Sequence, residues 1–101
     1  MIDFTINDIV RISGGELHGA AEGGTPVAGA VIDSRAAGEG IMFCALKGER
    51  VDGHDYIASA LAQGAACALA SRAPAGVSGP VIVVPDVQRA MAALARETRE
   101  R

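Results

Sequence analysis

The stretch GIMFCALKGERVDGHDYIASALAQGAACALA, residues 40–70, decides the fold. Its first seven residues, 40–46, are apolar throughout, which predicts a strand that is buried on both faces. Residues 55–63 then repeat apolar side chains at helical spacing, and Gly64 is typical of a helix end. Residues 66–70 are a second short apolar run. A strand, a helix and a strand in this order predict a right-handed crossover with parallel strands, and therefore an α/β domain.

Further strands extend this unit on both sides. Residues 27–32 and 81–84 have few polar positions and are typical of buried strands, while residues 16–19 suit a short edge strand. Together with the crossover they predict a mixed sheet of about five strands, flanked by helices.

Helices are expected at both ends of the chain. Thr5 suits the N-cap of a first helix, and Asp8 lies three residues on, where its charge faces the positive helix end. Gly14 and the glycine after it end this helix. Asp86 is placed to cap a last helix, in which the apolar side chains after it keep helical spacing.

The length and composition of the chain fit one compact domain. The chain has 101 residues, half of them apolar but only 3% aromatic, so the core must consist of aliphatic side chains. A net charge of −3 argues against a strongly basic nucleic-acid binder. The first residues lack the pattern of a signal peptide, and the apolar runs have the length of strands rather than membrane spans.

The two cysteines, Cys44 and Cys67, each lie inside an apolar run. We expect two buried, reduced thiols and a cytoplasmic protein, with a disulfide as the alternative. Zinc is less favoured than a disulfide, because His18 and His54 have no cysteine or histidine at ligand spacing.

Two loops follow strands in the way that ligand sites of open α/β sheets require. Asp33-Ser34-Arg35 comes directly after residues 27–32, and residues 47–54, KGERVDGH, come directly after residues 40–46. Ser34 can donate and accept hydrogen bonds, and the basic side chains can bind phosphate or carboxylate. The structural alternatives are that Asp33 caps a turn, that Arg35 forms a surface ion pair, that Asp52 or His54 caps the next helix, and that Glu49 is merely solvated.

Motifs of catalysis are not found in this sequence. It has no glycine-rich phosphate loop ending in Lys-Ser/Thr, no dinucleotide fingerprint and no nucleophile elbow. No histidine or cysteine has an obvious activating partner. The residues alone therefore predict a binding module, with no catalytic residue and no metal site.

At the same two loops the sequence resembles a known family. Asp33-Ser34-Arg35, residues 40–57 and residues 60–65 are similar to the N-terminal domain of the Mur ligases, bacterial ATP-dependent enzymes that form amide bonds in peptidoglycan synthesis. The resemblance covers nearly the whole chain. Residues 14–19 and 45–50 most resemble the branch that joins D-alanyl-D-alanine to UDP-N-acetylmuramoyl-tripeptide. The alternative is the branch that adds the third peptide residue, diaminopimelate or lysine, which shares the Asp-Ser-Arg and Asp-Gly-His elements.

The resemblance implies that residues 1–101 are one domain that binds the UDP end of the UDP-N-acetylmuramoyl-peptide. The implied UDP-binding residues are Ser34, Arg35, Lys47, Gly48, Glu49, Arg50, Asp52 and His54. It further implies that ATP and Mg²⁺ bind to a central ATPase domain which, like the C-terminal domain, is not part of this chain. Two hypotheses of other classes stay open: a stand-alone sugar-nucleotide-binding module and a purely structural interaction module.

Overall fold

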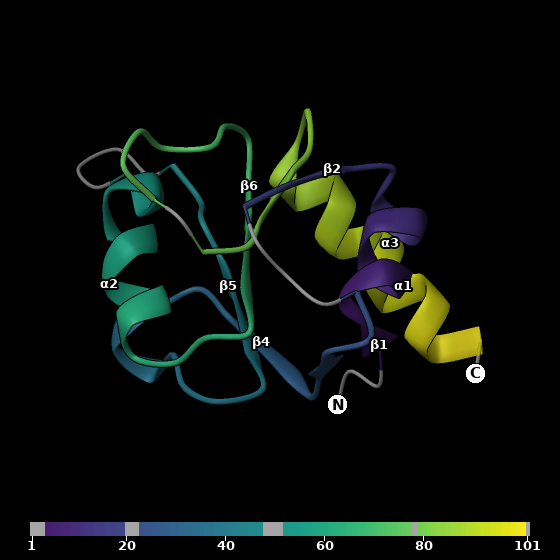
Figure 1. The fold of residues 1–101 in the computed structure, drawn as a ribbon. Helices are drawn as coiled ribbons and strands as arrows, with labels where there is room; N and C mark the ends of the chain where they lie inside the picture. Colours follow the sequence, from purple (N-terminus) through teal and green to yellow (C-terminus); the bar gives the residue numbers. More distant parts are fainter. Residues whose placement is uncertain (1–3, 20–22, 48–51, 78, 101) are drawn as a thin grey trace.

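Three layers make up the computed structural model, which describes residues 4–19, 23–47, 52–77 and 79–100. A sheet lies in the middle, with helix α2 on one face and helices α1 and α3 on the other (Figure 1). The elements in chain order are β1 (Phe4–Thr5), α1 (Ile6–Ser13), β2 (Glu16–His18), β3 (Pro26–Val27), β4 (Gly29–Val31), the 3₁₀ turn η1 (Ser34–Ala36), β5 (Ile41–Cys44), the 3₁₀ turn η2 (Gly53–Tyr56), α2 (Ile57–Ala62), β6 (Cys67–Ala70), β7 (Val81–Val83) and α3 (Val87–Glu100).

The main sheet has five strands in the order β2-β7-β6-β5-β4. Strands β4 to β7 are parallel, and β2 pairs antiparallel with β7 at one edge. The expected mixed sheet, its edge strand and the parallel pair joined through α2 are thereby confirmed. Because the four parallel strands point the same way, their carboxyl ends lie side by side, and the segments that follow them all lie there. This is the carboxyl edge of the sheet.

One predicted strand is divided. Residues 27–32 were expected as a single strand, but the chain changes partners within it: Val27 pairs with Phe4 in a small separate sheet, whereas Gly29 pairs with Ile41 in the main one. Between them the amide of Ala28 donates to the carbonyl of Gly40 at 2.7 Å. A local apolar pattern carries no information about this change of partner.

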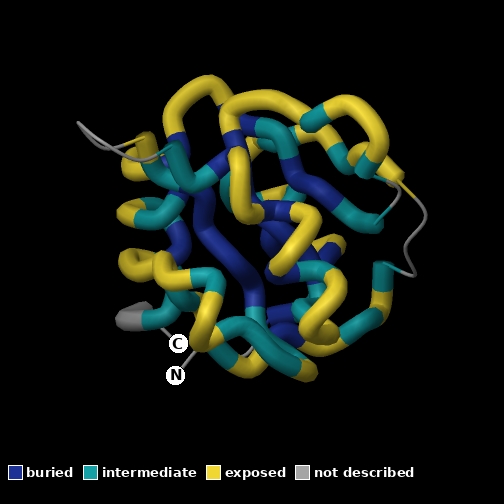
Figure 2. The backbone as a smooth tube through the Cα atoms, turned by 90° about the vertical axis from the view of Figure 1, so that its left-hand side faces the viewer, coloured by how far each residue is buried: buried dark blue, intermediate teal, exposed yellow. Residues whose placement is uncertain are grey.

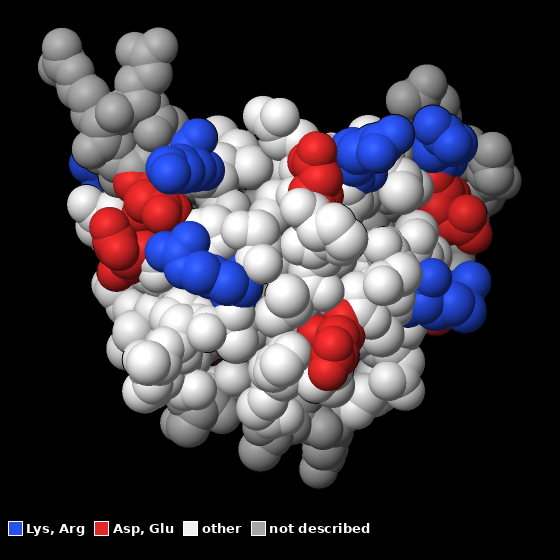
Figure 3. All heavy atoms as spheres, turned by 90° about the horizontal axis from the view of Figure 1, so that it is seen from above, with Lys and Arg blue, Asp and Glu red and all other residues white. Residues whose placement is uncertain are grey.

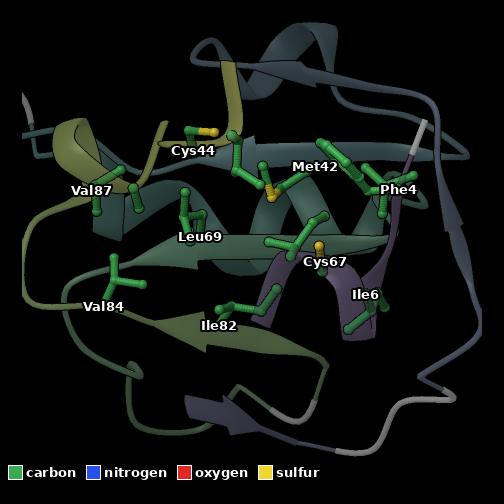
Figure 4. Packing of buried hydrophobic residues seen from close by; sticks show 13 residues of the cluster. Phe4, Ile6, Met42, Cys44, Cys67, Leu69, Ile82, Val84 and Val87 are labelled. Carbon is green, nitrogen blue, oxygen red and sulfur yellow. The ribbon is translucent and has the colours of Figure 1, made fainter. Parts of the chain in front are cut away.

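The side chains of the central strands alternate between two apolar cores. Met42 and Cys44 of β5 point toward α1 and α3, where they join Leu69 and Ile82 (Figure 4). Phe43, between them, points toward α2. The strand is buried on both faces, as predicted, and Figure 2 shows the buried strands surrounded by exposed loops.

The caps form as the sequence indicates. The Thr5 hydroxyl accepts from the amide of Asp8, whose carboxylate accepts from the amide of Thr5, so two backbone donors at the start of the helix are satisfied. Gly14 ends α1 at φ 70°, a left-handed conformation that suits glycine. Asp86 accepts from the amide of Arg89 at the start of α3. The predicted helix 55–63 is shorter, because its first turn is the 3₁₀ turn η2.

Both cysteines are buried and free, as predicted. Burial raises the pKa of each thiol to about 12, so the thiolate form is strongly disfavoured. In the described part of the chain, every helix is too short or too polar to cross a membrane.

Candidate functional site

The segments after the four parallel strands line two adjoining hollows. The first hollow is lined by Ile32, Asp33, Ser34, Arg35, Phe43, Leu46, Lys47, Gly53, Tyr56 and Gln88. The second is lined by Ala45, Leu46, Lys47, His54, Ser71, Pro85, Asp86, Val87 and Gln88. The first has a volume of about 740 Å³, within the range of small-molecule sites. Figure 3 shows this edge from above, with basic and acidic groups spread over a largely uncharged surface.

The two loops singled out in the sequence meet here. Ser34, Arg35 and Lys47 line the first hollow, and Lys47 and His54 line the second. Asp52 lies behind His54 and is hydrogen-bonded to it. The other three predicted residues, Gly48, Glu49 and Arg50, lie outside the described residues.

The first loop is held by its own side chains. The Asp33 carboxylate accepts from the amide of Arg35 and caps η1, and the Arg35 guanidinium binds the same carboxylate at 2.8 Å. These hydrogen bonds, the side-chain one above all, lower the pKa of Asp33 to about 2. The capping and ion-pair alternatives are therefore realised for Asp33 and Arg35. The Arg35 side chain is 89% exposed, so this pair is well solvated.

Ser34 is positioned through its backbone. Its carbonyl accepts from the Gln63 side chain at 2.9 Å, which ties the first loop to the end of α2. Its hydroxyl makes no hydrogen bond to another residue in the described part of the chain. The hydroxyl therefore stays available to a ligand, and Ser34 is one of the residues that line the first hollow.

The second loop is closed at its base. The amide of Gly53 donates to the carbonyl of Leu46 at 2.7 Å, and Lys47 and Asp52 form an isolated antiparallel bridge. A Cβ at Gly53 would lie 2.7 Å from the Leu46 nitrogen, so no larger residue fits without a backbone shift. This closure holds Lys47 at the boundary between the two hollows.

His54 connects two segments that follow neighbouring strands. Its Nδ1 lies 2.6 Å from Asp52 Oδ1, and its Nε2 accepts from the amide of Ser71 at 3.0 Å. Because Nε2 accepts an N–H, the ring is neutral and carries its proton on Nδ1, which donates to Asp52. The backbone and side-chain hydrogen bonds from His54 lower the pKa of Asp52 to about 2. Arg72 also binds Asp52, at 3.3 Å.

The side chains of Asp52, His54 and Ser71 are connected as in a catalytic triad. Asp52 is bonded to Nδ1 of His54, and the Ser71 hydroxyl lies 3.0 Å from Nε2. The backbone amide of Ser71 already occupies the lone pair of Nε2. The imidazole is therefore poorly placed to take the hydroxyl proton, and the group serves better as a structural link. No cluster of three metal-ligating side chains occurs within the described ranges.

Sequence reasoning missed four polar residues around the two hollows: Ser71, Arg72, Tyr56 and Gln88. Ser71 directly follows the apolar run 66–70, so the argument used for the first two loops could have found it. Tyr56 and Gln88 lie on helical segments, where no local signal marks them. Tyr56 and Ile32 are large, unusually exposed apolar side chains, 43% and 62%, and both line the first hollow.

One known protein family matches most of this chain. Residues 26–99 match the model described as Mur ligase family, catalytic domain. The chain belongs to the Mur ligase family. The fold expected from the family resemblance is thus confirmed together with the family itself.

Individual members of this family are similar to most of this chain. UDP-N-acetylmuramoyl-tripeptide–D-alanyl-D-alanine ligase of Mycobacterium tuberculosis is 48% identical over 91 residues, 86% of this chain and 17% of that protein. UDP-N-acetylmuramoyl-L-alanyl-D-glutamate–2,6-diaminopimelate ligase of Geobacillus kaustophilus is 47% identical over 74 residues, 72% of this chain and 15% of that protein. A crystal structure of MurF from Acinetobacter baumannii superposes with a TM-score of 0.85 at 32% identity, covering 97% of this chain and 21% of that one.

The chain thus spans about a fifth or less of the length of these Mur ligases. Over nearly equal shares of the chain it is more similar to the D-alanyl-D-alanine ligase, with 48% identity over 86%, than to the diaminopimelate ligase of Geobacillus thermodenitrificans, with 43% identity over 84%. This favours the first branch, as the sequence reading did.

Proposed function

We propose that this chain is the domain that anchors the UDP end of a UDP-N-acetylmuramoyl-peptide within an ATP-dependent ligase. The observation that carries the proposal is the convergence of Ser34 and Lys47 on one hollow at the carboxyl edge of a parallel sheet. These loops are also the ones on which the family resemblance rests.

The chemistry of the first hollow suits a nucleotide. The Ser34 hydroxyl can bond to the edge of a uracil ring, and the exposed rings and methyl groups of Tyr56 and Ile32 offer it an apolar surface. Lys47 forms no ion pair with an acidic residue in the described part, so its charge can meet a diphosphate. In this proposal Arg35, Asp52 and His54 shape the walls of the nucleotide site. Gly48, Glu49 and Arg50 are proposed to complete the wall that the second loop forms.

The reaction we propose for the complete enzyme joins D-alanyl-D-alanine to UDP-N-acetylmuramoyl-tripeptide in cytoplasmic peptidoglycan synthesis. ATP, with Mg²⁺, would activate the peptide carboxylate as an acyl phosphate in another part of the enzyme, and the amine would then attack it. Residues 1–101 contribute one substrate-binding domain to this ligase and no catalytic group.

A second candidate is the ligase that adds the third peptide residue, favoured by the 47% identity to the diaminopimelate ligase. The complete enzyme separates the two: one accepts UDP-muramoyl-tripeptide with D-alanyl-D-alanine, the other UDP-muramoyl-dipeptide with a diamino acid. A stand-alone sugar-nucleotide-binding module would bind UDP and support neither reaction.

Titration of the ¹⁵N-labelled chain with UDP tests the proposed site. We expect saturable shifts of the amides of Ser34, Lys47, Tyr56 and Gln88, with ADP as the control for recognition of the base. The proposal fails if the chemical shifts of these amides stay unchanged at UDP concentrations well above those at which the enzyme would use its substrate. It also fails if the shifts map instead to β2 and α1, away from the two hollows.

A further inference from the structure

His54 stands out among the described residues as a polar side chain in the interior. It is 6% exposed, while every other residue that is buried to this degree in the described part is apolar. Both ring nitrogens are bonded, one to Asp52 on its own loop and one to the amide of Ser71 beyond β6. A buried imidazole with both nitrogens satisfied holds its neighbours in a defined geometry.

The link joins the second loop to the segment after the next strand by two routes. The buried route runs from the Ser71 amide through the imidazole of His54 to Asp52. The outer route runs from Arg72 to the other oxygen of Asp52, and the Arg72 side chain is 57% exposed. Because water competes with the outer pair, the buried route supplies most of the restraint.

The hydrogen bonds of His54 influence the two hollows by positioning Lys47. Asp52 forms the antiparallel bridge with Lys47, and Gly53, next to it, is bonded to Leu46. The imidazole therefore fixes the base of the loop that carries Lys47, which lines both hollows. If the bond to Ser71 is lost, only the exposed pair of Arg72 and Asp52 still joins the loop to the segment after β6.

We propose that His54 is a positioning residue of the nucleotide site, which acts through its bond to the Ser71 amide and sets the place of Lys47. This inference rests on the proposed function. The imidazole works as a neutral ring with its proton on Nδ1, and the ligand itself is met by Lys47 and the first loop.

Two substitutions separate the two bonds of the ring. A glutamine side-chain oxygen can take the position of Nε2 and accept from the Ser71 amide, so His54→Gln retains the cross-strand bond. An asparagine amide takes the position of Nδ1, so His54→Asn retains the bond to Asp52 and loses the one to Ser71. His18→Asn is the matched control, because this other histidine lies on the edge strand β2 with its side chain 45% exposed.

The first measurement needs no ligand. Nitrogen NMR of the wild-type ring should find the proton on Nδ1, and amide hydrogen exchange of Gly53 should be about two- to tenfold faster in His54→Asn than in wild type, as expected for one lost neutral hydrogen bond. His54→Gln and His18→Asn should stay near wild type. A ring protonated on Nε2, or equal exchange in the Asn and Gln variants, overturns the inference.

The second measurement is UDP affinity by the same amide shifts. His54→Asn should bind UDP about two- to tenfold more weakly, while His54→Gln and His18→Asn bind as wild type does. Wild type that fails to bind UDP overturns the proposed function, and the role of His54 is then decided by the Gly53 exchange. Wild type that binds UDP together with equal affinities of the Asn and Gln variants overturns the inference alone.

Discussion

Gly53 packs directly on the backbone of Leu46. Its amide donates to the Leu46 carbonyl at 2.7 Å, and a Cβ added to it would lie 2.7 Å from the Leu46 nitrogen and 2.8 Å from the Leu46 oxygen. This contact closes the loop that carries Lys47 and starts the turn that carries His54. Glycine at this position therefore lets the second loop close tightly against Leu46.

Gly53→Ala should destabilise the fold by about 1–3 kcal/mol, because backbone atoms on both sides must shift to admit the methyl group. Gly38→Ala is the matched control, since a Cβ there meets nothing within 4 Å. Urea unfolding of both variants measures the difference. Equal stability of Gly53→Ala and Gly38→Ala would show that the close approach to Leu46 is not a constraint.

Much of this architecture could be predicted because local sequence patterns determine it. The apolar run at residues 40–46 and the helical spacing of residues 55–63 predict the crossover without knowledge of any contact. Once β4 to β7 are parallel, the segments that follow them must share one edge. The meeting of Ser34 and Lys47 is therefore a consequence of topology.

The rest depends on contacts between distant residues. The bond from Ser71 to His54 spans 17 positions, and no spacing rule connects an isolated histidine to a backbone amide just beyond the next strand. The division of the strand after Pro26 depends on Phe4 as a partner, which a local apolar pattern does not reveal. The ion pair of Arg35 with Asp33, by contrast, joins near neighbours and was one of the alternatives that the sequence predicts, while binding of phosphate by Arg35 stays a prediction.

Acid should weaken the fold through Asp33 and Asp52. Hydrogen bonds lower the pKa of each carboxyl from 3.8 to about 2, so the folded state holds the ionised forms more firmly than the unfolded state does. Their contribution to stability is complete above the unfolded pKa and is lost as the pH falls toward about 2. Unfolding free energies measured across this window should decline in wild type.

Asp52→Asn isolates one of the two carboxyls, because asparagine keeps an acceptor for the His54 amide but does not titrate. The decline between pH 3.8 and about 2 should be shallower in this variant than in wild type, and shallower still when Asp33→Asn is added. A slope unchanged by both substitutions would mean that other carboxyls govern the acid response.

Cys44 and Cys67 should resist thiol reagents in the native protein near neutral pH. Burial raises both pKa values to about 12, so the reactive thiolate is scarce, and the sulfur atoms lie within the core that faces α1 and α3. Mass spectrometry after brief alkylation should find no label on the native chain and two labels after unfolding in guanidinium. Rapid native labelling of either thiol contradicts this prediction.

Ser34→Ala should weaken UDP binding about two- to tenfold, the cost of one lost neutral hydrogen bond of roughly 0.5–1.5 kcal/mol. The first loop should survive the change, because it is held by the Ser34 carbonyl bond to Gln63 and by Asp33 rather than by the hydroxyl. In the complete ligase, KM for the UDP substrate should rise while kcat stays nearly constant, since contacts far from the reacting carboxylate stabilise ground and transition states alike. Ser59→Ala, at an exposed position on α2, is the control. If instead the melting temperature of Ser34→Ala falls while KM is unchanged, the hydroxyl shapes the turn η1 and does not bind the nucleotide.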